Sequence, residues 1–138
     1  MKALTIGKVA KQAGIGVETI RFYERRGLLE EPPRNGSGYR QYSLKTVVKL
    51  RFIKKAKQLG FSLKEIEELI ALRHKHGATC GDIKAQAEEK IRNIEERIRD
   101  LSKMKEALVE LTCQCSGNNG SVTECPILTA LDPPGEDL

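Results

Sequence analysis

Four cysteines offer the most distinctive chemistry in this chain, and all of them lie in its C-terminal half. Cys80 stands alone, Cys113 and Cys115 form a Cys-x-Cys pair, and Cys125 precedes a proline. Thiolates bind soft or borderline ions such as Hg(II), Cu(I), Cd(II), Pb(II) and Zn(II). We expect no secretion signal and a cytoplasmic location, where cysteines serve metal or redox chemistry more often than structural disulfides.

Histidine is missing from the segment that holds three of the cysteines. The chain has two histidines, His74 and His76, and both precede Cys80. We expect them to be solvated residues at a helix end. Zinc sites often combine thiolate with imidazole ligands, so a set of thiolates alone favours a larger, softer ion. No histidine base or carboxylate pair accompanies the cysteines, and we therefore do not expect an enzyme.

A long helix must separate these cysteines. Between residues 80 and 112, apolar residues recur in steps of three and four, at 83, 87, 91, 94, 98, 101, 104, 108 and 111. This heptad-like pattern predicts a coiled coil. A helix of that length spans about 48 Å, so Cys80 and Cys113 of one chain cannot share a metal ion. The narrow apolar seam needs a partner, which we expect to be a second copy of the chain.

The direction of that coiled coil decides whether a shared site exists. In an antiparallel pair, the start of one helix meets the end of the other. Cys80 of one subunit would then approach Cys113, Cys115 and Cys125 of its partner, giving two thiolate sites per dimer. A parallel pair would not bring these cysteines together.

Charge divides the chain into two dissimilar parts. Residues 1–76 contain 17 Lys and Arg against 7 Asp and Glu, a net charge of +10, whereas residues 77–138 have a net charge of −5. A basic module of this kind is expected to bind a polyanion. No run of about 18 apolar residues occurs, so we expect no membrane span.

The basic part carries the pattern of a helix-turn-helix. Thr5 is a candidate N-cap for a helix over 6–13, and a second helix is predicted over 17–26, with Gly14 and Gly27 as breakers. Two short helices joined by a glycine-containing turn are typical of DNA-binding modules. Further helices are predicted after Ser43 and after Ser62, which forms a capping box with Glu65.

Residues 31–42 cannot be helical, because two prolines and two glycines interrupt them. They predict a two-stranded wing whose turn is flanked by Arg34 and Arg40. Arginine binds phosphate oxygens in a forked geometry and also enters minor grooves. Tyr39 and Tyr42 have an alternative role in packing the wing against the helices, and for Tyr42 we favour that role.

The predicted fold is therefore mostly α. A winged helix-turn-helix DNA-binding domain over 1–76 is followed by a dimerisation helix over 80–112. A metal-binding loop and a short C-terminal helix complete the chain over 113–131.

These pieces together resemble the MerR family of bacterial metal-responsive transcription regulators. The resemblance covers nearly the whole chain and rests most on the runs TIRFYERRGLL and GYRQY, joined by IGKVA and LGFSLKEI. It implies that the second helix enters the major groove, with Thr19, Arg21 and Tyr23 at DNA-contacting positions. Arg34, Tyr39 and Arg40 match the DNA-binding wing.

The resemblance also implies a mechanism. Family dimers bind a double-stranded promoter whose spacer is too long for RNA polymerase. They repress without inducer, and on binding it they bend and untwist the DNA to activate transcription.

The cysteine pattern resembles that of the mercury sensors in this family. Copper(I) sensors lack the cysteine at the helix start, and zinc sensors carry adjacent cysteines with a histidine in the loop. The resemblance thus implies Hg(II) as inducer, bound by Cys80 of one subunit with Cys115 and Cys125 of the other. Cys113 matches a non-ligand position and is retained as a possible auxiliary ligand.

Three alternatives remain open at this point. The same kind of regulator would sense Zn(II), Cd(II) or Pb(II) instead. A cytosolic metal buffer or chaperone would use the cysteines without the basic half. A thiol-redox switch would respond to peroxide without any metal.

Overall fold

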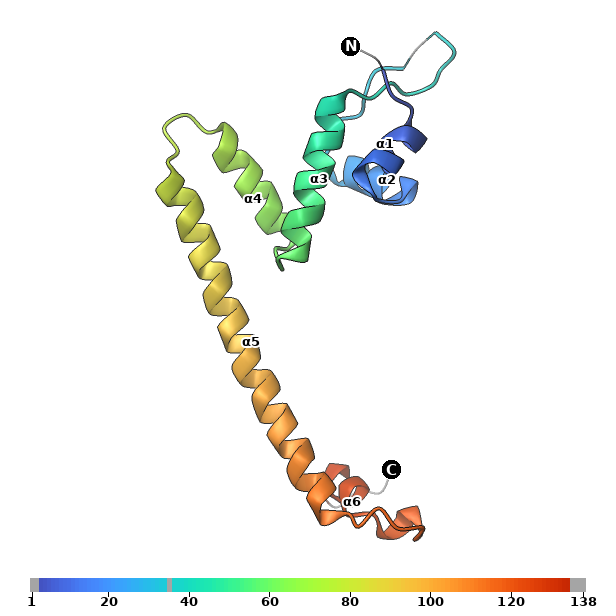
Figure 1. The fold of residues 1–138 in the computed structure, drawn as a ribbon, viewed down its shortest axis with the longest axis vertical. Helices are drawn as coiled ribbons and strands as arrows, with labels where there is room; N and C mark the ends of the chain where they lie inside the picture. The colour runs from blue at the N-terminus through green and yellow to red at the C-terminus, as the bar shows by residue number, and fades with distance from the viewer. Residues whose placement is uncertain (1–2, 35, 135–138) are drawn as a thin grey trace. The chain divides into compact units, whose positions relative to one another are not determined.

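The computed structural model describes residues 3–34 and 36–134, and these are predominantly helical (Figure 1). The helices are α1 (Ile6–Ala13), α2 (Val17–Arg26), α3 (Leu44–Gln58), α4 (Leu63–His74), α5 (Cys80–Gln114), the short 3-10 helix η1 (Val122–Glu124) and α6 (Pro126–Leu131). Internal contacts divide the chain into two units, Met1–Ala87 and Glu88–Leu138. The division falls inside α5, later in the chain than the boundary expected from charge.

The first two helices form the predicted helix-turn-helix. The hydroxyl of Thr5 accepts a hydrogen bond from the backbone N–H of Lys8 at 3.3 Å, which caps α1 as expected. Gly14 ends α1 in a left-handed conformation with φ of 71°, and Gly27 ends α2 with φ of 85°. Residues with a side chain rarely adopt such angles, so glycine fixes both helix ends.

One apolar core holds the first unit together. It draws on α1, α2, α3 and α4 and on the segment that leads out of the wing. Its most completely buried side chains are Val9, Ile20, Tyr42, Leu50, Ile53 and Ile66. The packing role favoured for Tyr42 is confirmed, because only 1% of this residue is exposed.

Two basic side chains of α3 hold the C-terminal end of α1. Arg51 donates to the carbonyl of Gln12 through Nε at 3.2 Å and Nη2 at 2.9 Å. Lys54 donates to the carbonyl of Gly14 at 2.8 Å. Because the last carbonyls of a helix lack intrahelical partners, these bonds both satisfy them and fix α1 against α3.

The wing is less regular than the two strands predicted from the sequence. Its backbone pairing among the described residues consists of two isolated antiparallel bridges, Arg34 with Arg40 and Leu4 with Tyr42. Pro32 and Pro33 explain the difference, because proline has no N–H to donate to a strand ladder. The wing is thus an extended loop pinned at two points.

The fourth helix begins with the predicted capping box. The N–H of Ser62 donates to the Glu65 carboxylate at 2.8 Å, and the N–H of Glu65 donates to the Ser62 hydroxyl at 3.2 Å. Near this junction Leu59 is 60% exposed, although it continues the apolar spacing of α3. It follows the last helical turn as the C-cap residue and so leaves the buried face.

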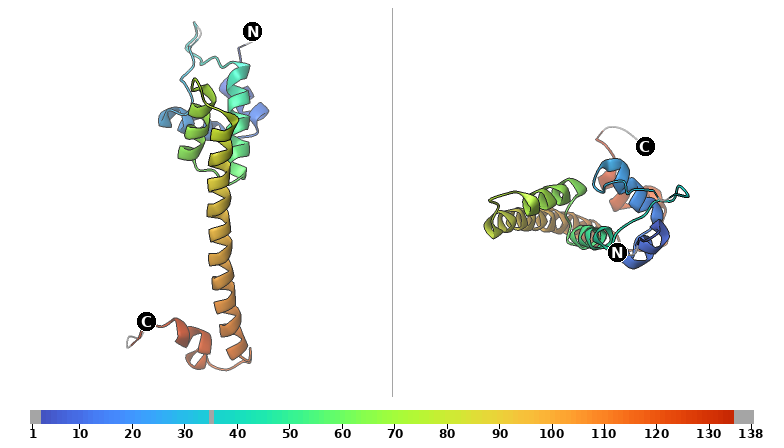
Figure 2. Two further views of the ribbon diagram at one scale, coloured as in Figure 1. Left: turned by 90° about the vertical axis from the view of Figure 1, so that its left-hand side faces the viewer. Right: turned by 90° about the horizontal axis from the view of Figure 1, so that it is seen from above.

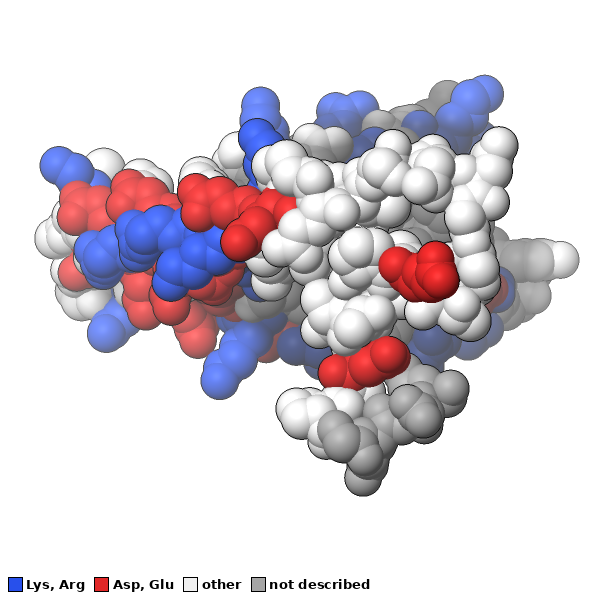
Figure 3. Space-filling view, turned by 90° about the horizontal axis from the view of Figure 1, so that it is seen from below, with Lys and Arg blue, Asp and Glu red and all other residues white. Residues whose placement is uncertain are grey.

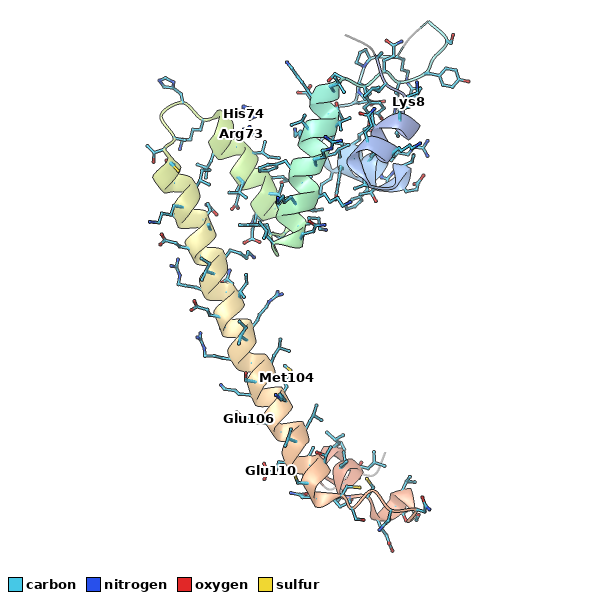
Figure 4. The ribbon with its side chains drawn as sticks, viewed as in Figure 1. Lys8, Arg73, His74, Met104, Glu106 and Glu110 are labelled. Carbon is cyan, nitrogen blue, oxygen red and sulfur yellow. The ribbon has the colours of Figure 1, made fainter. Side chains whose placement is uncertain are left out.

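Helix α5 has 35 residues and extends two residues beyond its predicted C-terminal end. Figure 2 shows it as one unbroken helix. None of its residues is buried. The apolar seam is open: Ile91 is 53% exposed, Leu101 62% and Met104, labelled in Figure 4, 59%. Acidic and basic side chains alternate over the helix surface in Figure 3. None of the described helices combines the length and apolar character that crossing a bilayer requires.

The core predicts a clear contrast between two positions on α3. We expect Leu50→Ala to lower the free energy of unfolding by about 2–5 kcal/mol, because a fully buried side chain leaves a cavity. Leu44→Ala, the same substitution at an exposed position of the same helix, is the matched control and should change it by less than about 0.5 kcal/mol. Urea denaturation followed by circular dichroism measures both, and equal losses would contradict this assignment of the core.

Candidate DNA-binding surface and metal centre

The outward face of α2 presents polar side chains beside the wing. Arg21 is exposed and pairs with Glu18 one turn earlier at 2.9 Å. Thr19 is half-buried, and Phe22 is 44% exposed. On the wing, Tyr39 is 71% exposed, so its ring stands in solvent. An exposed basic helix face with an aromatic residue near it suits a duplex surface.

A cleft of about 410 Å³ lies between the start of α1, the face of α2 and the wing. It is lined by Thr5, Ile6, Arg21, Arg34, Gly38, Tyr39 and Arg40. Arg34 is oriented by a hydrogen bond to the carbonyl of Gly38 at 2.9 Å. Four of the six residues singled out from the sequence for DNA contact therefore line one concave surface. Three of the four are arginines, which suit phosphate oxygens.

Two of the six residues make their main contacts within the domain. Tyr23 is 6% exposed and belongs to the core, and burial raises the pKa of its hydroxyl. Arg40 forms bonds to Glu24 and Glu31, so it is engaged within the protein. The pKa of Arg40 is raised, mainly by a hydrogen bond to Tyr42 and to a smaller extent by the negative charge of Glu24. Burial is also the main cause of the raised pKa of Tyr42.

Cys80 is the first residue of α5 and is exposed. A second capping box precedes it, which sequence reasoning missed. The N–H of Thr79 donates to the Asp82 carboxylate at 2.8 Å, and the N–H of Asp82 donates back to the Thr79 hydroxyl at 3.3 Å. The Thr-x-x-Asp pattern at 79–82 was the available signal. The box fixes the helical turn that presents the Cys80 thiol.

Beyond the end of α5, the loop brings two thiols together. Cys113, in the last turn of the helix, is exposed, whereas Cys115 and Cys125 are half-buried. The backbone N–H groups of Leu128 and Ile127, at the start of α6, lower the pKa of Cys125 against the opposing effect of burial. A hydrogen bond between the side chains of Cys115 and Cys125 lowers it further. A thiol that ionises readily is a better metal ligand.

Within the described part of a single chain, the structure brings together only these two of the predicted metal ligands, Cys115 and Cys125. Among the residues that the structure describes, no three His, Cys, Asp or Glu side chains converge on a point that would hold a metal ion. His74 and His76 are exposed, as predicted. Figure 4 shows His74 at the end of α4.

The lowered pKa of Cys125 is testable by alkylation. In a variant that keeps Cys125 and replaces the other cysteines by serine, we expect the iodoacetamide rate to rise with pH at a midpoint below the ordinary range for thiols. The physical reason is that the two N–H groups stabilise the thiolate in the folded loop. Unfolding the same variant in urea should move the midpoint upward, and an unchanged midpoint would contradict this geometry.

Comparison with known proteins places the chain in a family. The model described as "MerR HTH family regulatory protein" matches residues 4–73, and the one described as "MerR, DNA binding" matches residues 47–111. A mercuric resistance operon regulatory protein from Shigella flexneri is 44% identical over 131 residues, covering 95% of this chain and 89% of that protein.

Two solved structures share the fold over most of their length. PbrR691 from Ralstonia metallidurans CH34, in complex with lead(II), is 31% identical with a TM-score of 0.82, covering 94% of this chain and 99% of that one. MerR from Bacillus megaterium MB1, in complex with mercury(II), is 37% identical with a TM-score of 0.72, covering 93% and 98%. The resemblance seen in the sequence is thereby confirmed: this chain belongs to the MerR family of helix-turn-helix, DNA-binding transcription regulators.

Proposed function

We propose that this protein is a dimeric, mercury-responsive regulator that represses a promoter without metal and activates it by distorting the DNA when Hg(II) binds. Each metal is held by three thiolates, Cys80 of one subunit with Cys115 and Cys125 of the other. The observation that carries the proposal is the pairing of Cys115 with Cys125 at the start of α6, where the pKa of Cys125 is lowered.

The donor set fits a soft ion. Hg(II) prefers thiolates, and the loop from Cys113 to Cys125 contains no histidine. Cys113 is exposed and takes no part in the interactions that lower the pKa of Cys125, which supports its place as an auxiliary residue at most. The proposal requires reduced cysteines, as in the cytoplasm.

The open seam of α5 supports the dimer. Two copies in antiparallel orientation would cover each other's apolar residues and bring Cys80 to the cysteine loop of the second copy. A groove of about 750 Å³ within the first unit supports the same arrangement. Its apolar lining includes Phe52, Leu69 and Ile83, and its basic residues include Lys55 and Arg73. The acidic C-terminal half of a second copy suits it in charge.

The cleft beside α2 supports the DNA-binding role. We propose that Thr19 and Arg21 face the major groove from α2, while Arg34 and Tyr39 contact the backbone from the wing. RNA polymerase at the same promoter is the expected partner in activation. Two such modules in one dimer would bind two half-sites of the duplex.

A second inducer is favoured by a specific observation. A structural relative that shares the fold of this chain, PbrR691, was solved in complex with lead(II). The same three thiolates would hold Pb(II), and Zn(II) and Cd(II) are alternative inducers by the same chemistry. A reporter driven by the regulated promoter, titrated with each ion, separates these cases.

Mixing subunits tests the shared site. We expect wild-type dimers to bind one Hg(II) per subunit, as measured by the ultraviolet thiolate-to-metal band. Cys80→Ser and Cys125→Ser homodimers should each lose tight binding. A heterodimer of these two variants retains one complete set of ligands, so one tight site per heterodimer should return.

Cys113→Ser is the matched control, because it removes a thiol from the same loop and should leave tight binding intact. Tight binding that survives in Cys80→Ser homodimers would place the site within one tail. A heterodimer with no tight site would exclude ligands from two subunits.

Salt tests the DNA-binding role independently of metal. We expect the wild-type protein to bind a duplex selected from random sequence, with an affinity that falls by roughly 10³-fold or more between 50 and 200 mM salt. Arg21→Ala should weaken binding at every salt concentration and make the salt dependence shallower, because one phosphate or base contact is lost. Fluorescence anisotropy measures both, and binding insensitive to salt would contradict the role.

A further inference from the structure

A single carboxylate connects the recognition helix α2 to the wing. The Glu24 side chain is 6% exposed, and both of its oxygens accept hydrogen bonds from Nη1 of Arg40 at 3.1 Å. Its Oε1 also accepts a hydrogen bond from the Tyr42 hydroxyl at 2.9 Å. Glu24 lies on α2, whereas both of its partners lie on the chain that returns from the wing.

The wing end of this link is itself fixed. The backbone N–H of Tyr42 donates to the carbonyl of Leu4 at 2.8 Å, and the N–H of Leu4 donates back to Tyr42 at 2.8 Å. The ring of Tyr42 is buried in the core, so the position of its hydroxyl is fixed even when the rest of the wing moves. Nη2 of Arg40 also donates to Glu31 at 3.2 Å, at the start of the wing. Arg40 therefore ties both limbs of the wing to α2.

Burial distinguishes this ion pair from the exposed ion pair on the same helix. The Arg21–Glu18 pair is 49% and 80% exposed, and exposed pairs of this kind contribute little because water competes for both partners. The Glu24 carboxylate has almost no access to water and depends on Arg40 and Tyr42 for its hydrogen bonds. Removing the charge of a buried partner leaves the other partner unmatched, with a much larger effect.

We propose that Glu24 is a positioning residue that sets the spacing between α2 and the wing, and thereby selects the DNA shape that both contact together. The inference deepens the proposed DNA-binding role and rests on it. It reassigns Arg40 from a free phosphate contact to the floor of the cleft, where Arg21 and Arg34 provide the more exposed guanidinium groups.

The direction in which one substitution changes DNA affinity separates this positioning role from a purely electrostatic effect. Removing a negative charge from a DNA-binding surface normally strengthens DNA binding, because phosphate repulsion is reduced. Positioning predicts the opposite for Glu24→Gln in the full-length dimer. We expect about tenfold weaker binding, the equivalent of one lost charge-assisted hydrogen bond. Glu18→Gln, on the same helix, should bind as well as wild type or slightly more tightly.

A shortened duplex distinguishes loss of wing positioning from general damage to the fold. Hydroxyl-radical footprints of the wild-type dimer define the outer flanks that the wing protects. On a duplex trimmed of those flanks, Glu24→Gln and wild type should bind equally, because the wing no longer contributes. Tyr42→Phe keeps the Arg40 ion pair and should lose less affinity than Glu24→Gln on the full duplex. Circular dichroism melting verifies that each variant is folded.

Each outcome decides the proposal. Weaker binding by Glu24→Gln on the full duplex alone supports it. A loss of equal size on both duplexes, or unchanged or tighter binding, overturns the positioning role and leaves the DNA-binding role standing. A folded wild-type dimer that binds no duplex would overturn both.

Discussion

The apolar seam of α5 is the constraint on which the rest of this molecule depends. A helix with a one-sided apolar stripe is stabilised mainly by covering that stripe, and within its own chain α5 has no buried residue. The proposed second copy would explain the placement of the cysteines. Cys80 begins the helix and Cys113 lies in its last turn, so the two ends hold complementary parts of one proposed site.

Helix caps fix the thiols at both places. The Thr79–Asp82 box defines the turn that begins with Cys80, and the first N–H groups of α6 act on Cys125. The proposed metal site is thus built on helix starts, where backbone N–H groups lack other partners and favour negative charge. The Cys125 thiolate gains from that environment before any metal arrives.

Much of this architecture follows from local sequence signals. Thr5, Gly14 and the Ser62–Glu65 box mark helix ends by rules that involve neighbouring residues only, and the structure confirms each of them. The apolar steps of three and four correctly predict α5. These signals succeed because capping and periodicity are short-range properties of the chain.

The sequence could not predict which residues far apart in the chain pair with each other in the folded structure. Nothing in the run around Arg40 shows that its partner is Glu24, sixteen positions earlier, since an arginine near a turn suits a phosphate equally well. Local sequence also cannot decide whether Cys113 or Cys115 lies beside Cys125, because both cysteines flank Gln114. Only the path of the loop brings Cys115 to Cys125. The prolines of the wing can be read from the sequence. Their effect on strand pairing cannot, because it depends on which backbone N–H groups would have to donate hydrogen bonds to the opposite segment.

The hydrogen-bonded cluster of Glu24, Arg40 and Tyr42 has a consequence for how the sequence of such a regulator changes in evolution. Its three members face inward, whereas Arg21 and Phe22 on the same helix face solvent. Under the proposed roles, mutations at the outward positions would change the recognised sequence while the angle between helix and wing is retained. Mutations at the inward positions would be tolerated only in combination, because each removes a hydrogen-bond partner of the buried Glu24 cluster. Operator preference would then change one residue at a time at the outward positions, while the inward cluster would have to change as a unit.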